Sequence, residues 1–460
     1  MMLPGNIIIP DSSGRFLTGC ALALLLCGCS RPSAPDVRSS GHAVEPATER
    51  AGFLLSGEVN SQGTPVVAMW GSGKARAGED GAGYPILKSA RHALIFQDAV
   101  EAGAYNHHAQ LAYQGGVFFA AWSNHPKGED AAGQRVLFST SPDGAGWRKW
   151  AEAFPPPSEV RGWEDGFGYY SVAAPWHVHD GKVYLTARIY NFVGWENSDR
   201  TSRAPARDSE HIFQRYEYLG ILAREVTPQG ELGPVFSLST RMNRAKDLAY
   251  TFIPYGDPAY QPIADSINRI PETTPRLKGP LPLPVDTARL VEPTVYEAAD
   301  KSWVAVIRDD KFSHRKYVSF SRDHGTTWSK AMPTDIPDSP SLDVNVSAPD
   351  GSILLIGNHC AAAFDNPQSP THYDRDTLDV AVSFDGYYFP RAYALRTGVQ
   401  AWRVPRQAVR GRGGGPQYPS ALVAGDRLYV MYSFGKEDIW CSSVPLSDLR
   451  FPPSNNPKPN

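Results

Sequence analysis

The sequence predicts an all-β protein built as a single β-propeller. Three observations lead to this prediction: five segments with the pattern of β-hairpins, three copies of a turn motif, and glycines and prolines scattered between apolar runs. The 41 glycines and 40 prolines among 460 residues favour many tight turns over long helices. All-β folds often run long as one unit, so this length is compatible with one domain.

Five segments each combine a short apolar run, a turn with Gly or Asp, and a second run rich in aromatic and β-branched residues. This pattern predicts two antiparallel strands joined by a tight turn. In chain order they are HHAQLAYQGGVFFAAWS from residue 107, VAAPWHVHDGKVYLTARIY from 172, EPTVYEAADKSWVAVIRDD from 292, NVSAPDGSILLIGN from 345 and YPSALVAGDRLYVMYS from 418. Repeated small sheets of this kind indicate a propeller, because one blade cannot bury both of its faces alone.

Two weaker hairpin patterns affect the number of blades. They are AGFLLSGEVNSQGTPVVAMW at residues 51–70 and RYEYLGILAREV at 215–226. Counting both as blades gives seven, which we expect, with six as the alternative. The region from Met242 to Asp286 is rich in proline and lacks alternation, so we expect a long insertion there.

A turn motif follows three of the hairpins. It reads SPDGAGW at 141–147, SRDHGTTW at 321–328 and SFDGYYF at 383–389, and it resembles the Asp-box repeat. The Ser and Asp side chains satisfy backbone N–H groups of the turn, Gly permits a positive φ, and the aromatic residue packs on the blade. Asp323 is therefore expected to be structural, and Trp147, Trp328 and Phe389 should occupy equivalent positions.

The N-terminus predicts export. Arg15 precedes the apolar run FLTGCALALLLCGC, which ends at Cys29 and resembles a bacterial lipoprotein signal. We expect a signal peptide at 1–29 with a lipid anchor at Cys29, a flexible tether at 30–50, and the catalytic propeller at 51–460; a plain secretory signal is the alternative. We expect the lipid anchor to be the only attachment to a membrane. The exported protein would lie in the cell envelope or the periplasm, or it would be secreted.

Two cysteines remain for the propeller, Cys360 and Cys441, which could form one disulfide. The formal net charge is −3 and no dense tract of Lys and Arg occurs, so nucleic acid is excluded as a partner. We expect a monomer.

Asp boxes also occur in sialidases, but the early Arg-Ile-Pro signature of those enzymes is missing here. A wider resemblance runs through YNHHAQLAY, FFAAWSNHPKGEDAAGQRVLFSTSPDGAGW, EPTVYE, IPDSPS, RDTLDVAVSFDG and GGPQYPSALVAGDRLYVMYSFGKEDI. Together these phrases look like the propeller ulvan lyases and their relatives that act on rhamnose–glucuronate linkages. The resemblance implies a lyase that cleaves 4-linked uronates of an anionic polysaccharide by β-elimination.

Such a lyase must neutralise the uronate carboxylate, remove the C5 proton and protonate the leaving oxygen. The resemblance implies His107 as the base or its partner, His125 as the second histidine, Tyr170 as the acid and Arg188 as the carboxylate ligand. His108 competes with His107, since neighbouring side chains of a strand point to opposite faces, and Tyr169 competes with Tyr170 in the same way. No cofactor is needed for catalysis.

The resemblance also implies a structural zinc, for which His314, Cys360 and His372 offer nitrogen and sulfur ligands. A buried thiol with unrelated histidines is the alternative interpretation.

Two other function classes remain open. An exo-glycosidase, sialidase-like or rhamnosidase-like, would need converging acidic residues, for which Glu164, Asp165 and Glu292 are available. A non-catalytic glycan-binding propeller is the third class. Two charged groups, around Glu129 and around Lys436, are interpreted either as solvated turns or as ion pairs between blades.

Overall fold

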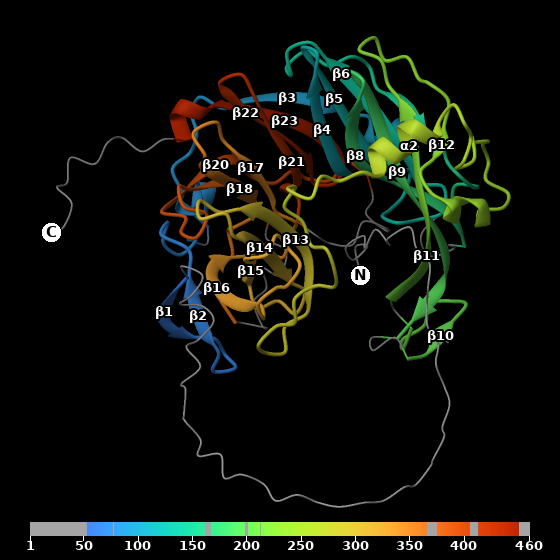
Figure 1. Ribbon diagram of the computed structural model, residues 1–460. Helices are drawn as coiled ribbons and strands as arrows, with labels where there is room; N and C mark the ends of the chain where they lie inside the picture. The colour runs from blue at the N-terminus through green and yellow to red at the C-terminus, as the bar shows by residue number, and fades with distance from the viewer. Residues whose placement is uncertain are drawn as a thin grey trace, which may run out of the picture.

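The structure of the protein is a computed structural model, which describes residues 53–76, 78–161, 167–197, 201–211, 213–365, 375–404 and 413–449. The predicted signal, tether and lipid anchor at Cys29 lie outside the described residues, as do Glu164, Asp165 and His372. Five sheets, almost entirely antiparallel, follow one another around a common centre (Figure 1). The predicted all-β propeller is confirmed, but it has five blades, and the expectation of seven or six is wrong.

Each blade begins with one of the five clear hairpins. The first blade contains β4 (Tyr105–Gln114), β5 (Val117–His125), β6 (Arg135–Ser141) and β7 (Ala151–Phe154). The second contains β8 (Gly168–His179), β9 (Lys182–Glu196), β10 (Arg203–Ala204), β11 (Phe213–Glu225) and β12 (Phe236–Ser237). The third contains β13 (Leu290–Glu297), β14 (Trp303–Asp309), β15 (Arg315–Ser321) and β16 (Met332–Pro337). The fourth contains β17 (Val344–Ser347), β18 (Ile353–Gly357), β19 (Thr377–Ser383) and β20 (Arg391–Thr397). The fifth contains β21 (Pro416–Ala424), β22 (Arg427–Phe434) and β23 (Asp438–Pro445).

The two weaker hairpin patterns do not form blades of their own. The segment at 51–70 forms β1 (Leu54–Val59) and β2 (Pro65–Ala68), and β2 extends the third blade by pairing with β16 in parallel at Val67 and Thr334. The segment at 215–226 forms most of β11, which pairs along most of its length with β9. Each segment therefore completes an existing sheet, because it meets an open strand edge there.

The N-terminal part of the chain closes the ring. Strand β3 (Arg91–Phe96) pairs antiparallel with β23 and so supplies the outermost strand of the fifth blade. A core cluster then joins the fifth blade to the first, with Phe96, Trp122, Met431 and Ile439 buried in it. Closure of this kind leaves the first and last blades in contact and without a gap between their apolar faces.

The three Asp boxes lie at equivalent positions, between the third and fourth strands of the first, third and fourth blades. In the third blade, Ser321 Oγ donates to Asp323 Oδ1 at 2.7 Å and accepts from the backbone N–H of Gly325 at 2.8 Å. Gly325 has a φ of 80°, and a Cβ there would lie 2.8 Å from the ring of Trp303. The structural role expected for Asp323 is confirmed.

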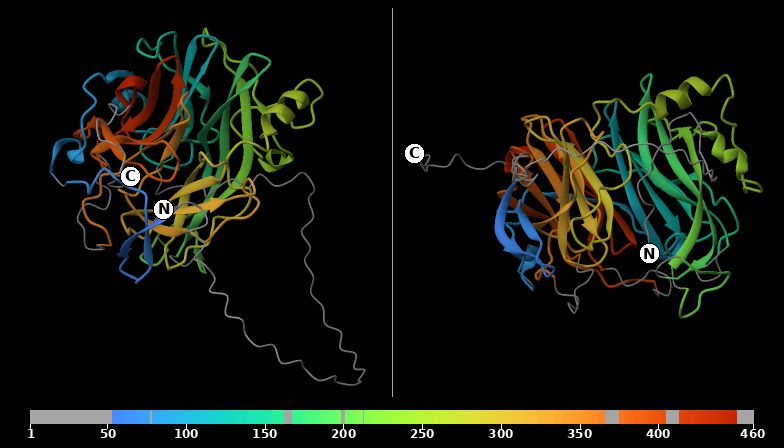
Figure 2. Two further views of the ribbon diagram at one scale, coloured as in Figure 1. Left: turned by 60° about the vertical axis from the view of Figure 1, so that its left-hand side comes forward. Right: turned by 60° about the horizontal axis from the view of Figure 1, so that its bottom comes forward.

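The remaining helices are short and peripheral. The insertion after β12 contains η3 (Thr240–Arg244) and α2 (Gln261–Asn268), and α2 lies on the outer side of the second blade (Figure 2). The other helices are η2 (Asp80–Gly83), α1 (Ala99–Ala102) and η4 (Leu446–Leu449). Among the described residues, no helix has the length and apolar character needed to cross a bilayer. Cys360 and Cys441 are both buried and neither is part of a disulfide, so the disulfide considered for them does not form.

Candidate active site

A cavity of about 260 Å³ lies at the centre of the propeller. The first strands of successive blades contact one another around it: β4 contacts β8 and β21, and β17 contacts β13 and β21. Every one of these five strands contributes to its wall, and Arg188 reaches it from β9. The lining residues are His108, Ala109, Gln110, Val172, Ala173, Pro175, Arg188, Glu292, Pro293, Leu342, Val344, Tyr418, Pro419 and Ser420.

Three of the first strands carry a β-bulge at the cavity. The register shifts between His107 and Gln110 in β4, between Val291 and Thr294 in β13, and between Gln417 and Ser420 in β21. At each bulge a residue with a side chain adopts a positive φ: 55° at His108, 52° at Glu292 and 54° at Tyr418. Such residues cost about 1–3 kcal/mol each and concentrate at functional sites.

Proline increases this strain at two of the bulges. Glu292 and Tyr418 directly precede Pro293 and Pro419, and a following proline favours extended backbone in the residue before it. All three strained side chains line the same cavity. The bulges thus direct His108, Glu292 and Tyr418 toward the centre of the molecule.

Glu292 and Tyr418 are hydrogen bonded across the cavity wall. The Tyr418 hydroxyl donates to Glu292 Oε1 at 2.8 Å, and Arg308 donates to Glu292 Oε2 at 2.9 Å and to the Tyr418 oxygen at 3.1 Å. The Arg308 side chain is 3 % exposed and also pairs with Asp310. A phenol, a carboxylate and a guanidinium therefore form one buried group.

A second guanidinium lies over the Tyr418 ring. The Arg375 guanidinium carbon is 5.3 Å from the ring centroid, and its nitrogens donate to the Gln417 side chain and the Pro340 carbonyl. Positive charge at this distance attracts electrons of the ring face. Negative charge that develops on the Tyr418 oxygen is stabilised by Arg375 and Arg308 together.

Arg188 is a cation without a matching anion in the cavity. Within the described ranges it forms no ion pair with any carboxylate, and its buried Nε atom has no hydrogen-bond partner. A buried guanidinium is stable when it meets a planar anion that can accept two parallel hydrogen bonds. The cavity is therefore suited to a ligand that carries a carboxylate.

The two neighbouring histidines lie on the same side of β4. Their ring centroids are 5.0 Å apart, because the bulge and the positive φ of His108 break the alternation of side chains. The expectation that one histidine would face away from the other is wrong for this reason. His107 Nδ1 lies 2.7 Å from Ser433 Oγ, and His108 Nδ1 lies 3.1 Å from Ser123 Oγ. Burial lowers the pKa of His108 to about 4, against the opposing effect of the Glu129 carboxylate.

Glu129 and Lys436 form a buried ion pair beside these histidines, with 2.8 Å between Lys436 Nζ and Glu129 Oε2. Glu129 follows β5 of the first blade and Lys436 precedes β23 of the fifth, so the ion-pair interpretation of these charges is confirmed. The Tyr105 ring packs against the Lys436 ammonium at 5.7 Å. Burial, and then the negative charge of Glu129, raise the pKa of the Tyr105 phenol.

His125 lies away from the cavity and holds the loop that carries Glu129. Its Nδ1 atom accepts the backbone N–H groups of Lys127 at 3.1 Å and Gly128 at 3.0 Å, and its Nε2 atom contacts the Ala132 carbonyl at 3.2 Å. Burial lowers the pKa of His125 to about 4, which matches these neutral-ring hydrogen bonds. Its predicted role as a second histidine of the reaction stays a prediction.

Tyr170 lies beside the cavity rather than in its wall. It is 2 % exposed and its ring stacks on Tyr190, with 5.2 Å between the ring centroids. Burial, followed by the charge of Asp130, raises the pKa of the Tyr170 phenol well above its usual value. Tyr169 packs against the apolar core of the blade. The roles predicted for both tyrosines stay predictions.

Two of the three predicted zinc ligands are described. His314 and Cys360 are buried, and the Cys360 thiol contacts Ser339 Oγ at 3.3 Å. Burial raises the pKa of this thiol, which favours its protonated form. The third ligand, His372, lies outside the described residues, so the zinc at this place stays a prediction.

Sequence reasoning named Glu292 only as one of several acids and missed Tyr418, Arg308 and Arg375. A signal for Glu292 and Tyr418 exists: VEPT and QYPS each place a polar residue before a proline where a hairpin begins. This pattern marks equivalent positions of two blades.

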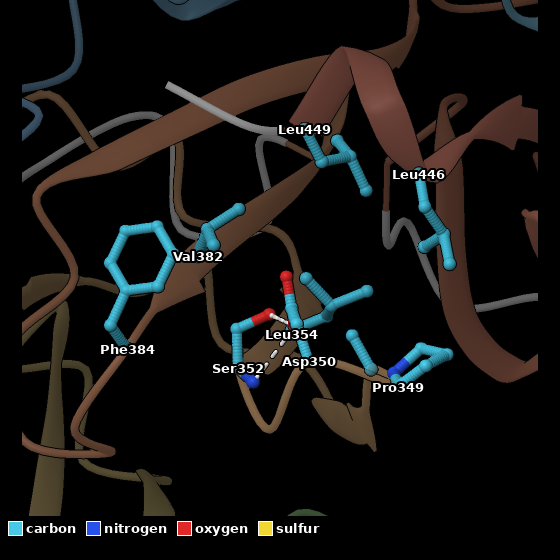
Figure 3. Close-up of a pocket in the computed structure, with 9 residues that line it drawn as sticks. Pro349, Asp350, Ser352, Leu354, Val382, Phe384, Leu446 and Leu449 are labelled. Atoms are coloured by element: carbon cyan, nitrogen blue, oxygen red, sulfur yellow. Dashed lines mark hydrogen bonds between the residues drawn. The ribbon is translucent and has the colours of Figure 1, made fainter. Parts of the chain in front are cut away.

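A second hollow lies between the fourth blade and η4 (Figure 3). Its volume is about 10 Å³, which is room for about one water molecule. Its polar residues satisfy each other, since Ser352 Oγ donates to Asp350 Oδ1 at 2.6 Å. It is therefore too small for a sugar, and the central cavity is the candidate site.

Comparisons with known proteins agree with the propeller fold. Residues 267–430 match a BNR repeat-like domain, and residues 82–186 match the family of BT_1020-like N-terminal beta propellers. A search of curated proteins finds no match. A solved structure titled sialidase is similar at 18% identity and a TM-score of 0.54 over 79% of this chain and 33% of that one, so the chain spans about a third of its length.

Two further solved structures are more distant. A protein of unknown function from Dyadobacter fermentans is 14% identical, with a TM-score of 0.43 over 77% of this chain and 99% of that one. The Trypanosoma rangeli sialidase in complex with 2,3-difluorosialic acid is 15% identical, with a TM-score of 0.44 over 82% of this chain and 60% of that one.

Proposed function

We propose that the protein is an exo-glycosidase that releases an acidic sugar from a glycan. The observation that carries this proposal is the Tyr418–Glu292 hydrogen bond of 2.8 Å in the wall of a cavity that also contains Arg188, a cation with no ion pair among the described residues. In this proposal Tyr418 is the nucleophile, Glu292 accepts its proton, and Arg188 binds the sugar carboxylate. A nucleophile hydrogen bonded to a base that a third group orients is the usual arrangement for covalent catalysis.

The charges around the pair suit such a step. As the Tyr418 oxygen attacks the anomeric carbon, the bond from this carbon to the aglycone oxygen breaks, and the aglycone leaves with a proton from solvent. The phenol proton passes to Glu292 Oε1, and Arg308 stabilises the Tyr418 oxygen from 3.1 Å. Water then hydrolyses the bond between Tyr418 and the sugar, and Glu292 returns the proton to Tyr418. A phenol is neutral before it reacts, so it can approach a sugar that carries a carboxylate without charge repulsion. Most glycosidases use two carboxyl groups, and enzymes with a tyrosine nucleophile are an exception to that rule.

The size of the cavity favours action at a chain end. Its volume of about 260 Å³ is below the range of about 300–1,000 Å³ that accommodates drug-sized ligands. One sugar residue fits such a volume better than several residues of a polysaccharide. The similarity of the fold to a protein titled sialidase supports the same class of reaction.

A lyase remains the second candidate, and one observation favours it. His108 lines the cavity next to Arg188, and its low pKa of about 4 keeps the imidazole neutral, as a base requires. Tyr170, the acid of that mechanism, is absent from the cavity wall formed by the described residues.

The test incubates the full chain with aryl glycosides of acidic sugars and with uronate polysaccharides such as ulvan. Released reducing sugar and near-ultraviolet absorbance are recorded together, because only a lyase product contains a double bond conjugated to its carboxylate. We expect sugar release without absorbance. Tyr418→Phe should lower turnover by on the order of 10³-fold or more, and Glu292→Gln by about 10²–10⁴-fold.

Tyr113→Phe is the matched control, since Tyr113 is 43% exposed at the other end of β4. It should retain normal turnover. An absorbing product, or a Tyr418→Phe protein of normal thermal stability with an unchanged rate, would show that the proposal is wrong.

Arg188 gives a separate prediction about substrate charge. Arg188→Met should raise KM for carboxylated glycosides by about 10–100-fold, which corresponds to the loss of a charge-assisted pair. For the corresponding glycosides of a neutral sugar, Arg188→Met and the wild type should show the same cleavage or binding. Equal effects on acidic and neutral substrates would contradict the role of Arg188.

A further inference from the structure

We infer that His107, His108 and Glu129 form a binding site for a divalent transition-metal ion, with zinc as the best match. One potential ligand atom of each residue lies within 4.8 Å of the other two. Among the residues that the structure describes, this is the one group of three His, Cys, Asp or Glu side chains that meets this condition. None of the three is among the zinc ligands that the sequence suggested.

The two imidazoles are held by hydrogen bonds from outside the site. Ser433 of β22 binds His107 Nδ1, and Ser123 of β5 binds His108 Nδ1. Both serines are fully buried. Both contacts are made through Nδ1, and such outer hydrogen bonds are typical of metal-binding histidines because they fix the ring and its tautomer.

The chemistry of the three ligands matches zinc. Imidazole nitrogen and carboxylate oxygen are zinc ligands, and the three residues offer two of the former and one of the latter. The buried Nε2 atom of His108 has no hydrogen-bond partner among the described residues, and a metal ion would coordinate its lone pair. Because His108 lines the cavity, the ion would lie at the cavity wall, where a tetrahedral ion with three protein ligands accepts one water or ligand oxygen.

Lys436 competes with the metal for Glu129. Its ammonium lies 2.8 Å from Glu129 Oε2, and both side chains are buried. A metal ion must displace this positive charge or force it to lose a proton. Metal affinity should therefore increase when the charge of Lys436 is removed, whereas a purely structural ion pair would give no such gain.

The proposed metal ligands are different residues from the proposed nucleophile and base, Tyr418 and Glu292, although the His107 ring packs against Tyr418 with 4.2 Å between the ring centroids. It is incompatible with the lyase mechanism through His108, because a metal-bound Nε2 atom cannot accept a proton. Metal binding is measured without substrate, so its failure would not affect the glycosidase proposal.

The experiment measures Zn²⁺ binding by calorimetry to the full chain after treatment with a chelator. Cys360→Ser is introduced throughout, so that a site involving this thiol cannot contribute. We expect one Zn²⁺ per chain with a Kd of about 1 μM or lower. His108→Ala and Glu129→Gln should each weaken binding by at least about tenfold, and Lys436→Met should strengthen it by about tenfold or more.

His179→Ala is the control and should bind Zn²⁺ normally, since His179 is the last residue of β8 and is not part of the group of three ligands. Co²⁺ provides a test that needs no variant of the ligands: a tetrahedral visible spectrum without a thiolate charge-transfer band is expected. A Kd in the millimolar range, unchanged affinity in folded His108→Ala, or an octahedral Co²⁺ spectrum would overturn the inference.

Discussion

His359 is a fully buried histidine between two carboxylates. Its Nδ1 atom lies 2.7 Å from Asp379 Oδ1, and its Nε2 atom lies 3.2 Å from Asp343 Oδ2. Lys316 also pairs with Asp343, at 3.0 Å. Burial opposes the charged ring, but Asp379 and Asp343 together raise the pKa of His359 to about 10. The ring is therefore charged at neutral pH.

This charge predicts a dependence of stability on pH. A group whose pKa is raised by folding contributes its full stabilisation at pH values below its pKa in the unfolded chain, which is about 6.5 for histidine. This contribution is lost as the pH rises toward 10, the pKa of His359 in the fold. The free energy of unfolding should therefore fall between pH 7 and 10, by on the order of a few kcal/mol. Urea denaturation followed by tryptophan fluorescence at several pH values measures this fall.

His359→Gln should be less stable at pH 6.5 and should lose less stability between pH 7 and 10. His92→Gln is the control, because burial lowers the pKa of His92 to about 4 and this ring stays neutral over the same range. Parallel curves for His359→Gln and the wild type would contradict the assigned charge.

The bulges of β4, β13 and β21 determine the site at the level of elements. A regular strand would send His107 and His108 to opposite faces of the sheet. The bulge in β4 instead brings both rings to one side of the strand. Equivalent bulges in β13 and β21 direct Glu292 and Tyr418 toward the cavity. Positive φ values at His108, Glu292 and Tyr418 show that these strands accept backbone strain where they meet the cavity.

The Asp box offers a test at the same scale. Ser321→Ala removes the acceptor of the buried Gly325 N–H and the donor to Asp323, and should lower the free energy of unfolding by about 1–2 kcal/mol. Chemical denaturation measures the difference. Thr326→Ala changes an exposed hydroxyl of the same turn and should cost less than about 0.5 kcal/mol. Equal effects of the two substitutions would show that Ser321 does not hold the turn.

Closure by β3 controls the stability of the whole propeller. Phe96 of β3 is 2% exposed and contacts the Trp122 ring, with 5.5 Å between centroids, so it joins the fifth blade to the first. Separation of these two blades would expose apolar faces on both. The closing strand comes from the opposite end of the chain, so unfolding of either end should affect the entire ring.

Phe96→Ala should therefore lower the free energy of unfolding by about 3–5 kcal/mol in a single cooperative transition. Leu94→Ala is the matched control on the same strand, since Leu94 is 37% exposed, and it should cost less than about 1 kcal/mol. Calorimetry and fluorescence together measure both the stability and the cooperativity. A separate early transition confined to one blade would contradict a closed ring.

The sequence by itself determined the all-β class, the five hairpins and the three Asp boxes. These features depend on contacts between residues close in the chain: alternation along a strand, glycine at a positive φ, and a serine that accepts an N–H four residues later, as Ser321 does from Gly325. Arg188 and His108 were likewise named from the sequence, and both line the central cavity.

The tertiary structure alone decided the number of blades and the composition of the site. Whether a hairpin forms a blade of its own depends on whether it can pair with the open edge of an existing sheet. The β1–β2 hairpin pairs through β2 with β16, the edge strand of the third blade. Glu292 and Tyr418 lie 126 positions apart in the chain, and only the ring brings them within 2.8 Å. Local patterns do not encode such distances, because closure of the ring and the bulges of its inner strands arise from packing between blades.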